Sequence, residues 1–264
     1  MSTRTVQQLF DLSGKTALIT GGSRGLGLQM AHALGEAGAR IMLSSRKADD
    51  LEQATADLQA AGIDARWIAA DCAKEDDTRR LAEQTLERMG AIDILVNNAG
   101  ASWGAPAESH PVEAWDKVMN LNVRGYFILS QHIANGYMIP KKTGRIINIA
   151  SIAGLNGNGP GMQTLAYNTS KTTVIGFTKT LAAEWGRYGI NVNAICPGFF
   201  MTKMAAGLIK SLGEDNMAAA APLGRLGDEE DLKGITLLYA SDAGKHITGQ
   251  WMAVDGGVSV VLGA

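Results

Sequence analysis

Short apolar runs and longer amphipathic segments alternate along most of this chain. The short runs are apolar at successive positions, as strands buried on both faces of a sheet require. They predict strands at residues 16–20, 40–44, 65–69, 92–96, 145–150, 190–195 and 251–254. The amphipathic segments predict helices at residues 25–37, 49–61, 76–89, 112–137, 165–185 and 228–241. This alternation predicts an α/β fold, with a doubly wound, seven-stranded parallel sheet and helices on both of its faces.

Glycine lies at the end of several predicted helices, at Gly38, Gly62, Gly90 and Gly186. Glycine favours the left-handed conformation that often ends a helix, because it has no Cβ to clash with the backbone. We therefore expect left-handed caps at these four positions.

Residues 1–264 are predicted to form a single domain, since no linker or low-complexity tract divides the chain. Residues 1–12 form an N-terminal extension before the first strand. Residues 199–225 interrupt the alternation with a methionine- and alanine-rich insertion before the last helix. This insertion is either a helical surface excursion, packed on the body or on a neighbouring subunit, or a lid over an apolar substrate.

Composition makes several classes of protein improbable. The chain is 46% apolar and 19% charged with a formal net charge of -2, so it lacks the basic excess typical of proteins that bind nucleic acid or anionic membranes. No apolar run reaches the roughly 20 residues that span a bilayer, and the N-terminus lacks a signal-peptide core, so we expect a cytoplasmic protein. Cys72 and Cys196 make no disulfide framework, and the four histidines do not cluster with acidic residues, so no metal site is expected.

The stretch LITGGSRGLG, residues 18–27, has two interpretations. It contains G-x-S-x-G around Ser23, the turn that presents the nucleophile of many hydrolases. It also places Gly21, Gly25 and Gly27 between a predicted strand and a predicted helix, where a glycine-rich turn binds a dinucleotide phosphate. Only one predicted strand precedes Ser23, whereas several normally precede the nucleophile of an α/β hydrolase. The cofactor interpretation is therefore favoured.

The end of the second predicted strand indicates which dinucleotide is bound. NAD-binding folds place an acidic residue about twenty positions after the glycine turn, whereas NADP-binding folds place a cation there for the 2′-phosphate. Here the sequence is Ser44, Ser45, Arg46 and Lys47, and Arg24 can add a second cation from the turn. This pattern predicts NADP(H) as the cofactor.

Three further residues are predicted to gather at the same edge of the sheet. Tyr167 and Lys171 are four residues apart on one predicted helix and share a face, and Ser151 follows a buried strand. A free phenol has a pKa of about 10, and a cation close to it favours the phenolate. Lys171 can therefore favour the phenolate of Tyr167, which assists proton transfer, and Ser151 can polarise a carbonyl. Each residue alone has an ordinary structural interpretation, but their combination favours carbonyl chemistry.

From about Leu12 to Gly257 the sequence resembles the short-chain dehydrogenase/reductase family of the compact, single-domain Rossmann type. The motifs that carry the resemblance are TGGSRGLG (20–27), Asp71, NNAG (97–100), Asn122 in NLNVRGYF, Ser151, YNTSK (167–171), PGFFMT (197–202) and ITGQWMAVDGG (247–257). The resemblance implies a homotetramer built partly on the predicted helices 112–137 and 165–185.

The resemblance also implies a role for each site residue. Tyr167 is the general acid and base, Lys171 lowers its pKa and binds the nicotinamide ribose, Ser151 polarises the carbonyl, and Asn122 holds a water in the proton relay. The implied cofactor-binding residues are Gly21, Ser23, Arg24, Gly25, Leu26, Gly27, Ser45, Arg46, Asp71, Cys72, Asn98, Ala99, Gly100, Tyr167, Lys171, Pro197, Gly198 and Thr202.

One departure from the family concerns the substrate pocket. The family commonly separates the serine and the tyrosine by thirteen residues, whereas Ser151 and Tyr167 are sixteen apart, with NGNGPGMQT between them. NNAGASWG (97–104) resembles reductases of 3-oxoacyl thioesters, while LAYNTSK and the N-terminal motif also resemble gluconate 5-dehydrogenases. The apolar residues 199–209 favour an apolar ketone. A regulatory protein without turnover usually lacks the tyrosine or the lysine, and both are present here.

Overall fold

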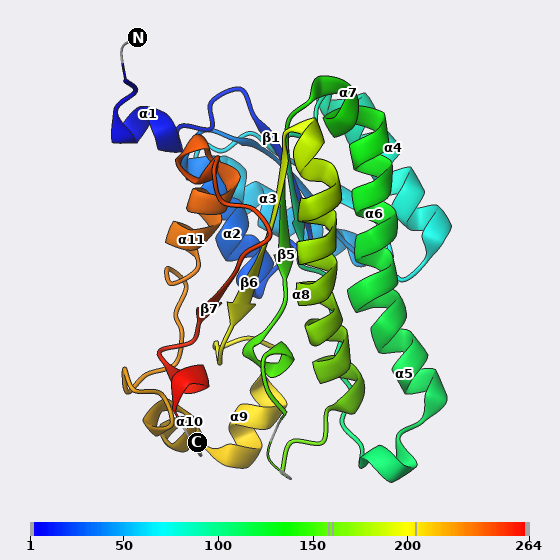
Figure 1. Cartoon of the computed structure of the whole chain (residues 1–264), viewed down its shortest axis with the longest axis vertical. Coiled ribbons are helices and arrows are strands. Elements are labelled where there is room, and N and C mark those ends of the chain that lie inside the picture. Colours follow the sequence, from blue (N-terminus) through cyan, green and yellow to red (C-terminus); the bar gives the residue numbers. More distant parts are fainter. Residues whose placement is uncertain (1–2, 158, 160, 204, 262–264) are drawn as a thin grey trace.

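The computed structural model describes residues 3–157, 159, 161–203 and 205–261 (Figure 1). Its centre is one seven-stranded, all-parallel sheet in the order β3-β2-β1-β4-β5-β6-β7, which confirms the predicted fold class. The strands are β1 (Thr16–Thr20), β2 (Arg40–Ser45), β3 (Ala65–Ala69), β4 (Ile94–Asn97), β5 (Gly144–Ile149), β6 (Ile190–Pro197) and β7 (Trp251–Val254).

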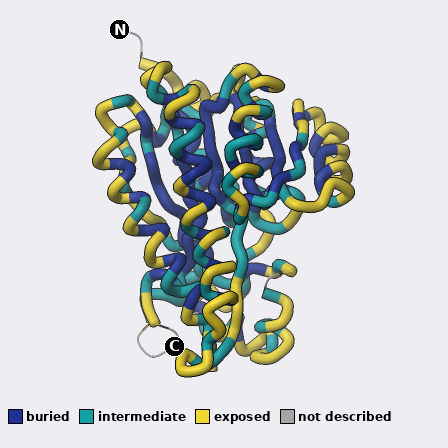
Figure 2. Tube along the Cα trace, turned by 90° about the vertical axis from the view of Figure 1, so that its right-hand side faces the viewer, coloured by how far each residue is buried: buried dark blue, intermediate teal, exposed yellow. Residues whose placement is uncertain are grey.

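Helices cover both faces of the sheet, and the alternation of side chains along each strand divides the core between them. On β1, Ile19 packs with α2, α3 and α11, whereas the adjacent Leu18 packs with α4, α6 and α8. Figure 2 shows the buried strands inside and exposed positions along the outer helices. These helices are α2 (Gly25–Glu36), α3 (Ala48–Ala60), α4 (Glu75–Met89), α6 (Gly125–Ile133), α8 (Leu165–Trp185) and α11 (Lys233–Ala240).

The predicted helix 112–137 is a longer helical run that contains two π turns. It consists of α5 (Val112–Met119), a π turn (Asn120–Arg124), α6, a second π turn (Ala134–Met138) and α7 (Ile139–Lys141). A π turn inserts an extra residue, which rotates the following helix relative to the preceding one, and such turns are frequent at functional sites. The first π turn contains the buried Asn122.

The predicted left-handed caps are correct at three positions and wrong at the fourth. Gly38, Gly62 and Gly90 have positive φ angles, but Gly186 is right-handed at φ -54°. After α8 the chain continues through a short 3₁₀ turn to Gly189, where φ is 73°. A Cβ on Gly189 would lie 2.5 Å from the carbonyl oxygen of Lys142, so the close approach of that segment requires glycine there.

The N-terminal extension contains more structure than the sequence indicated, and the insertion contains helices, as expected of a helical excursion. The N-terminal extension contains α1 (Val6–Phe10), which begins with a capping box between Thr5 and Gln8. The insertion 199–225 contains α9 (Ala206–Leu212) and α10 (Glu214–Ala219).

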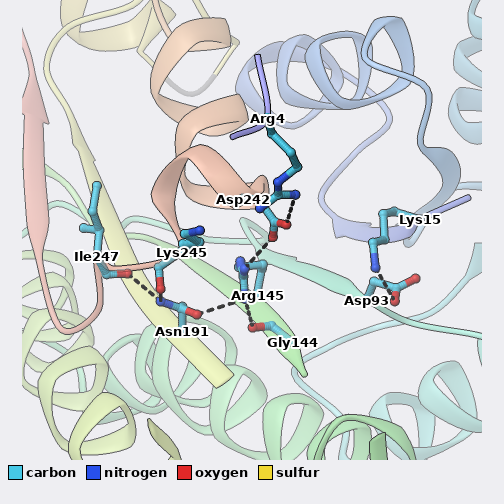
Figure 3. Close-up of polar contacts among 9 residues, drawn as sticks. All are labelled: Arg4, Lys15, Asp93, Gly144, Arg145, Asn191, Asp242, Lys245 and Ile247. Atoms are coloured by element: carbon cyan, nitrogen blue, oxygen red, sulfur yellow. Dashed lines mark hydrogen bonds and ion pairs between the residues drawn. The ribbon is translucent and has the colours of Figure 1, made fainter. Parts of the chain in front are cut away.

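At the amino edge of the sheet, one carboxylate, in the turn after α11, joins the N-terminal extension to β5 (Figure 3). Asp242 accepts hydrogen bonds from Arg4 at 2.6 Å and from Arg145 at 3.1 Å. Arg145 also donates to Asn191 on β6 at 2.9 Å. The N-terminal extension is therefore held to the sheet on the side opposite the candidate site.

Candidate active site

A cleft of about 2120 Å³ opens at the carboxyl edge of the sheet. Its centre lies where the chain order reverses, because β2 and β4 pair with opposite sides of β1. Ligands of doubly wound folds bind at this switch point. The cleft is lined by every predicted site residue except Asn122: Gly21, Ser23, Arg24, Gly25, Leu26, Gly27, Ser45, Arg46, Asp71, Cys72, Asn98, Ala99, Gly100, Ser151, Tyr167, Lys171, Pro197, Gly198 and Thr202.

The glycine turn between β1 and α2 provides space for a phosphate group close to the backbone. Gly21 and Gly25 have φ angles of 63° and 53°, which side chains disfavour. A Cβ on Gly27 would lie 2.3 Å from the carbonyl oxygen of Gly21. No side chain caps the N-terminus of α2, so its amide groups and partial positive charge are available to an anion. These features fit a dinucleotide pyrophosphate.

Hydrogen bonds from the end of β4 fix the geometry of this turn. The hydroxyl of Thr20 accepts from the backbone amides of Asn98 and Ala99, each at 3.0 Å. The side-chain amide of Asn98 donates to the carbonyls of Thr20 and Gly21 at 2.9 and 3.1 Å. The backbone around Asn98 and the glycine turn therefore form one rigid unit. The sequence pattern had marked both segments but not the contacts between them.

Cations gather where the 2′ position of a bound adenosine ribose is expected. Arg46 follows the end of β2 and is exposed, and Arg24 lies just before α2. Both line the cleft. Arg24 Nη1 donates to Asp50 Oδ2 on α3 at 3.2 Å. Asp50 carries no sequence motif, although its place four residues after Arg46 is a signal that could have found it.

Helix α8 brings Tyr167 and Lys171 to the same side of the cleft, one turn apart. The ammonium of Lys171 lies 5.6 Å from the centre of the Tyr167 ring and donates to the Ile149 carbonyl oxygen at 2.7 Å. Ser151 follows β5 and forms a hydrogen bond with the side chain of Tyr167. The structure therefore brings together the three residues that the sequence pattern had grouped.

The environment shifts the pKa values of the two titratable groups. Burial raises the pKa of the Tyr167 phenol above its usual value, and the hydrogen bond with Ser151 lowers it in part. Burial lowers the pKa of Lys171 to about 8. Near neutral pH the phenol therefore carries its proton, while the amine is mostly charged. This protonation state suits a tyrosine that donates a proton to a carbonyl oxygen.

Asn122 lies behind the cleft rather than in its wall. Its Oδ1 accepts from the amide of Ala101 at 2.8 Å, and its Nδ2 donates to the Ala101 carbonyl and to Ser170 Oγ, each at 2.9 Å. A Cβ on Gly100 would lie 3.4 Å from Asn122 Oδ1 and 3.7 Å from Lys171 Nζ. Asn122 therefore connects the π turn to α8 and to the loop after β4, immediately next to Lys171.

The substrate end of the cleft lies between two loops and the insertion. The amide of Ala105 donates to the Gln163 carbonyl at 2.8 Å, which joins the segment after β4 to the loop before α8. Positions 158 and 160 of this long loop, and position 204 of the insertion, lie outside the described residues. The described wall carries apolar side chains, which include Ile152, Met162, Phe199, Met201, Leu208, Leu212, Met217 and Val260, and polar ones, which include Asn156, Gln163, Lys203 and Asn216.

The described residues give no support to the hydrolase interpretation. Over these ranges, no hydrogen bond links Ser23 to a histidine, and no group of three or more histidine, cysteine or acidic side chains is arranged to hold a metal ion. A search of the same ranges for helices long and apolar enough to cross a bilayer finds none.

Comparison with known proteins identifies the family. The family model described as short chain dehydrogenase matches residues 15–212. The chain is 37% identical to gluconate 5-dehydrogenase of Gluconobacter oxydans, over 96% of this chain and 98% of that protein. It is 40% identical to the rhamnolipids biosynthesis 3-oxoacyl-[acyl-carrier-protein] reductase of Pseudomonas aeruginosa, over 94% and 97%.

A solved structure extends the likeness to three dimensions. The crystal structure of a gluconate 5-dehydrogenase from Burkholderia cenocepacia, in complex with NADP and tartrate, matches with a TM-score of 0.92. The two sequences are 34% identical, over 98% of this chain and 100% of that one. Fold, cleft and sequence agree, and this chain belongs to the short-chain dehydrogenase family of oxidoreductases.

Proposed function

We propose that this protein uses NADP(H) to transfer hydride between the nicotinamide and a ketone or a secondary alcohol. One observation carries the proposal. The Ser151 and Tyr167 side chains and the Lys171 ammonium lie in the same cleft as an uncapped glycine turn that has room for a pyrophosphate. The side chains suited to carbonyl chemistry and the turn suited to a dinucleotide thus lie at one edge of the sheet.

Ser151, Tyr167 and Lys171 have different roles in ketone reduction. NADPH, when bound, supplies the hydride. Ser151 and Tyr167 donate hydrogen bonds to the carbonyl oxygen, which orients the carbonyl and stabilises the negative charge that develops there. Tyr167 then gives its proton to that oxygen, and the Lys171 ammonium stabilises the phenolate that remains. In alcohol oxidation Tyr167 takes the proton back.

Arg24 and Arg46 support NADP(H) as the cofactor. Both guanidinium groups line the cleft near the end of β2, where a 2′-phosphate would lie, and each can form charge-assisted hydrogen bonds to phosphate oxygens. The remaining cofactor-lining residues are assigned the roles that the family resemblance implies. Two solved relatives are described as NADP complexes.

The substrate is proposed to be a 3-oxoacyl thioester or another apolar ketone. The support is the apolar wall formed by the insertion, with Phe199, Met201, Leu208 and Leu212, which acts as a lid in this proposal. A gluconate 5-dehydrogenase-like activity on a sugar acid is the alternative. It is supported by the relatives of that name and by Lys203, a cation on the same wall.

The enzyme is also proposed to work as a cytoplasmic assembly. In this proposal the chain forms one domain and assembles as a homotetramer in the cytoplasm, and its partner is a small carbonyl or alcohol substrate rather than nucleic acid or membrane. The low net charge of -2 supports a small-molecule partner rather than nucleic acid or an anionic membrane.

A panel of ketones followed by NADPH absorbance tests the activity. The panel includes 3-oxoacyl thioesters, keto sugar acids and aryl ketones, and each substrate is repeated with Tyr167→Phe. Loss of the proton donor is expected to reduce turnover by roughly 10²- to 10⁴-fold while NADPH still binds. Retained turnover in the variant contradicts the role of Tyr167. Labelling of Ser23 by a fluorophosphonate would instead support a hydrolase.

A further inference from the structure

The ammonium group of Lys171 is buried without an acidic partner. Its side chain is 3% exposed, and none of the ion pairs formed within the described ranges includes it. The carbonyl oxygen of Ile149 accepts one of its N–H groups at 2.7 Å. A buried cation with so few partners loses much of its solvation, so other groups must stabilise its charge.

Two aromatic rings lie close to this ammonium. The centre of the Tyr167 ring is 5.6 Å from Nζ, and the centre of the Tyr126 ring is 5.8 Å from it. Both distances are within the range in which the negative face of an aromatic ring attracts a cation, and the attraction grows when water is excluded. Tyr126 lies on α6 and is only 2% exposed.

Tyr126 also approaches the carbonyl that binds the amine. Its hydroxyl lies 3.5 Å from the Ile149 oxygen, the acceptor of the Lys171 hydrogen bond. This hydroxyl contact is long for a hydrogen bond. The ring of Tyr126, rather than its hydroxyl, therefore provides the larger part of its interaction with the Lys171 amine.

The π turn and a close helix contact fix the position of Tyr126. Asn122 in the π turn binds Ser170, and Tyr126, four residues later, faces the next residue of α8, Lys171. A Cβ on Gly125 would lie 2.4 Å from the Cys72 carbonyl oxygen, so glycine is required for α6 to pack this closely. The Asn122–Ser170 hydrogen bond and the close packing at Gly125 therefore hold the Tyr126 ring against the amine.

Among the described residues, no negatively charged group near Lys171 takes over the role of these rings. The titratable groups that face it are Tyr167 on its own helix, Tyr126 on α6 and Cys196 on β6. Burial raises the pKa of all three, so each is neutral near pH 7. The charge of the amine thus depends on one carbonyl and two ring faces.

We propose that Tyr126 is a positioning residue for Lys171: its ring holds the amine beside Tyr167 and helps to keep it protonated. The proposal rests on the proposed function, in which Lys171 stabilises the phenolate of Tyr167. Tyr126, from α6, thus joins Ser151 and Lys171 as a third side chain that influences the pKa of Tyr167.

The first test measures Lys171 without cofactor or substrate. Acetic anhydride labelling at a series of pH values, with mass spectrometry of the Lys171 peptide, gives the pKa of this amine in the protein alone. Tyr126→Leu removes the ring and is expected to lower that pKa by about one unit. Tyr126→Phe keeps the ring and is expected to match the wild type. An unchanged pKa in Tyr126→Leu overturns the proposal.

A control and a second variant separate this effect from loss of packing. Tyr239 is a tyrosine of similar burial, 3% exposed, on α11 at the other face of the sheet. Tyr239→Leu removes as much aromatic volume, yet is expected to leave the Lys171 pKa unchanged. If Tyr126→Leu does not fold, as judged by circular dichroism, Tyr126→Met carries the same expectation, because methionine fills irregular space well. A Met variant with an unchanged Lys171 pKa also overturns the proposal.

The second test uses the pH profile of alcohol oxidation. Without the ring, the charged lysine and the phenolate are both less favoured, so the rising limb of kcat in Tyr126→Leu is expected to move to higher pH. We expect kcat to fall roughly 3- to 10-fold with little change in KM, and Tyr126→Phe to restore it. Absence of turnover in the wild type with every substrate contradicts the proposed function alone, since the labelling experiment still decides the role of Tyr126.

Discussion

Arg24 and Asp50 form an ion pair across the mouth of the cleft. The guanidinium at the start of α2 donates to the carboxylate on α3 at 3.2 Å, through a single pair of atoms. The other guanidinium donors of Arg24 remain available to a ligand. Asp50 therefore places a negative charge beside the group that is proposed to bind the 2′-phosphate. Substitution of the arginine and substitution of the aspartate each test this arrangement.

Removal of the cations is expected to weaken NADPH selectively. Arg24→Ala and Arg46→Ala each remove charge-assisted hydrogen bonds to a phosphate that NADH lacks, so we expect about 10-fold weaker NADPH binding and unchanged NADH binding. Fluorescence titration of both nucleotides measures these affinities. Tighter binding of NADH than of NADPH by the wild type would contradict the roles of both arginines.

Removal of the carboxylate is expected to have the opposite effect. Asp50→Asn frees Arg24 and removes a charge that repels the 2′-phosphate, so NADPH is expected to bind roughly 2- to 5-fold more tightly at low salt. NADH binding is expected to stay constant. Asp49→Asn, on the same exposed turn of α3, is the control because Asp49 is not paired with Arg24. Weaker NADPH binding in Asp50→Asn would show that Asp50 positions Arg24 rather than competing for it.

The space at Gly27 is expected to be necessary for the cofactor turn. In Gly27→Ala the added Cβ would lie 2.3 Å from the Gly21 carbonyl oxygen and 2.6 Å from Asn98 Nδ2, so the turn must shift. A strain of about 1–3 kcal/mol corresponds to roughly 5- to 150-fold weaker NADPH binding if the shift is confined to the turn. Isothermal titration calorimetry and thermal unfolding measure the two effects.

A second glycine provides the control for this substitution. Gly176 lies on α8 with no neighbouring atom within 4 Å of an added Cβ. Gly176→Ala is therefore expected to keep the wild-type affinity and to increase stability slightly, because alanine favours the helix. Equal NADPH affinity in Gly27→Ala and the wild type would show that the turn does not approach the phosphates.

The regular parts of the fold were predictable because they follow from local patterns. The bounds of β1, β3 and β7 match the predicted runs at residues 16–20, 65–69 and 251–254. Apolar runs of this kind report burial on both faces, and the alternation with helices then determines a parallel sheet. The grouping of Ser151 with Tyr167 and Lys171 followed from similar reasoning, since Ser151 ends a strand at this edge, and Tyr167 and Lys171 share one face of a helix.

Features that depend on distant contacts were not predictable in this way. Arg4 and Asp242 are 238 positions apart, and no local pattern relates them. The choice of Gly189 over Gly186 as the left-handed glycine depends on the approach of Lys142 from another segment. The π turn has no periodic signature, so neither Asn122 nor the orientation of Tyr126 could be derived from spacing alone.

Asp242 is expected to stabilise the fold through charge, and the effect is expected to disappear in acid. Its pKa is lowered, chiefly by the hydrogen bond from Arg4. A carboxyl group with a lowered pKa in the folded state stabilises the protein above its unfolded value of about 4, and this contribution is lost as the pH falls through the lower folded value. The carboxylate is 47% exposed and solvent screens its bonds to Arg4 and Arg145, so Asp242→Asn is expected to cost at most about 0.5 kcal/mol in urea unfolding at pH 7, and less as the pH falls below 4. Asp64→Asn, which removes an exposed ion pair to Arg66 at 4.0 Å, is the control and is expected to cost almost nothing. A pH-independent cost for Asp242→Asn would show that the side chain acts by shape rather than by charge.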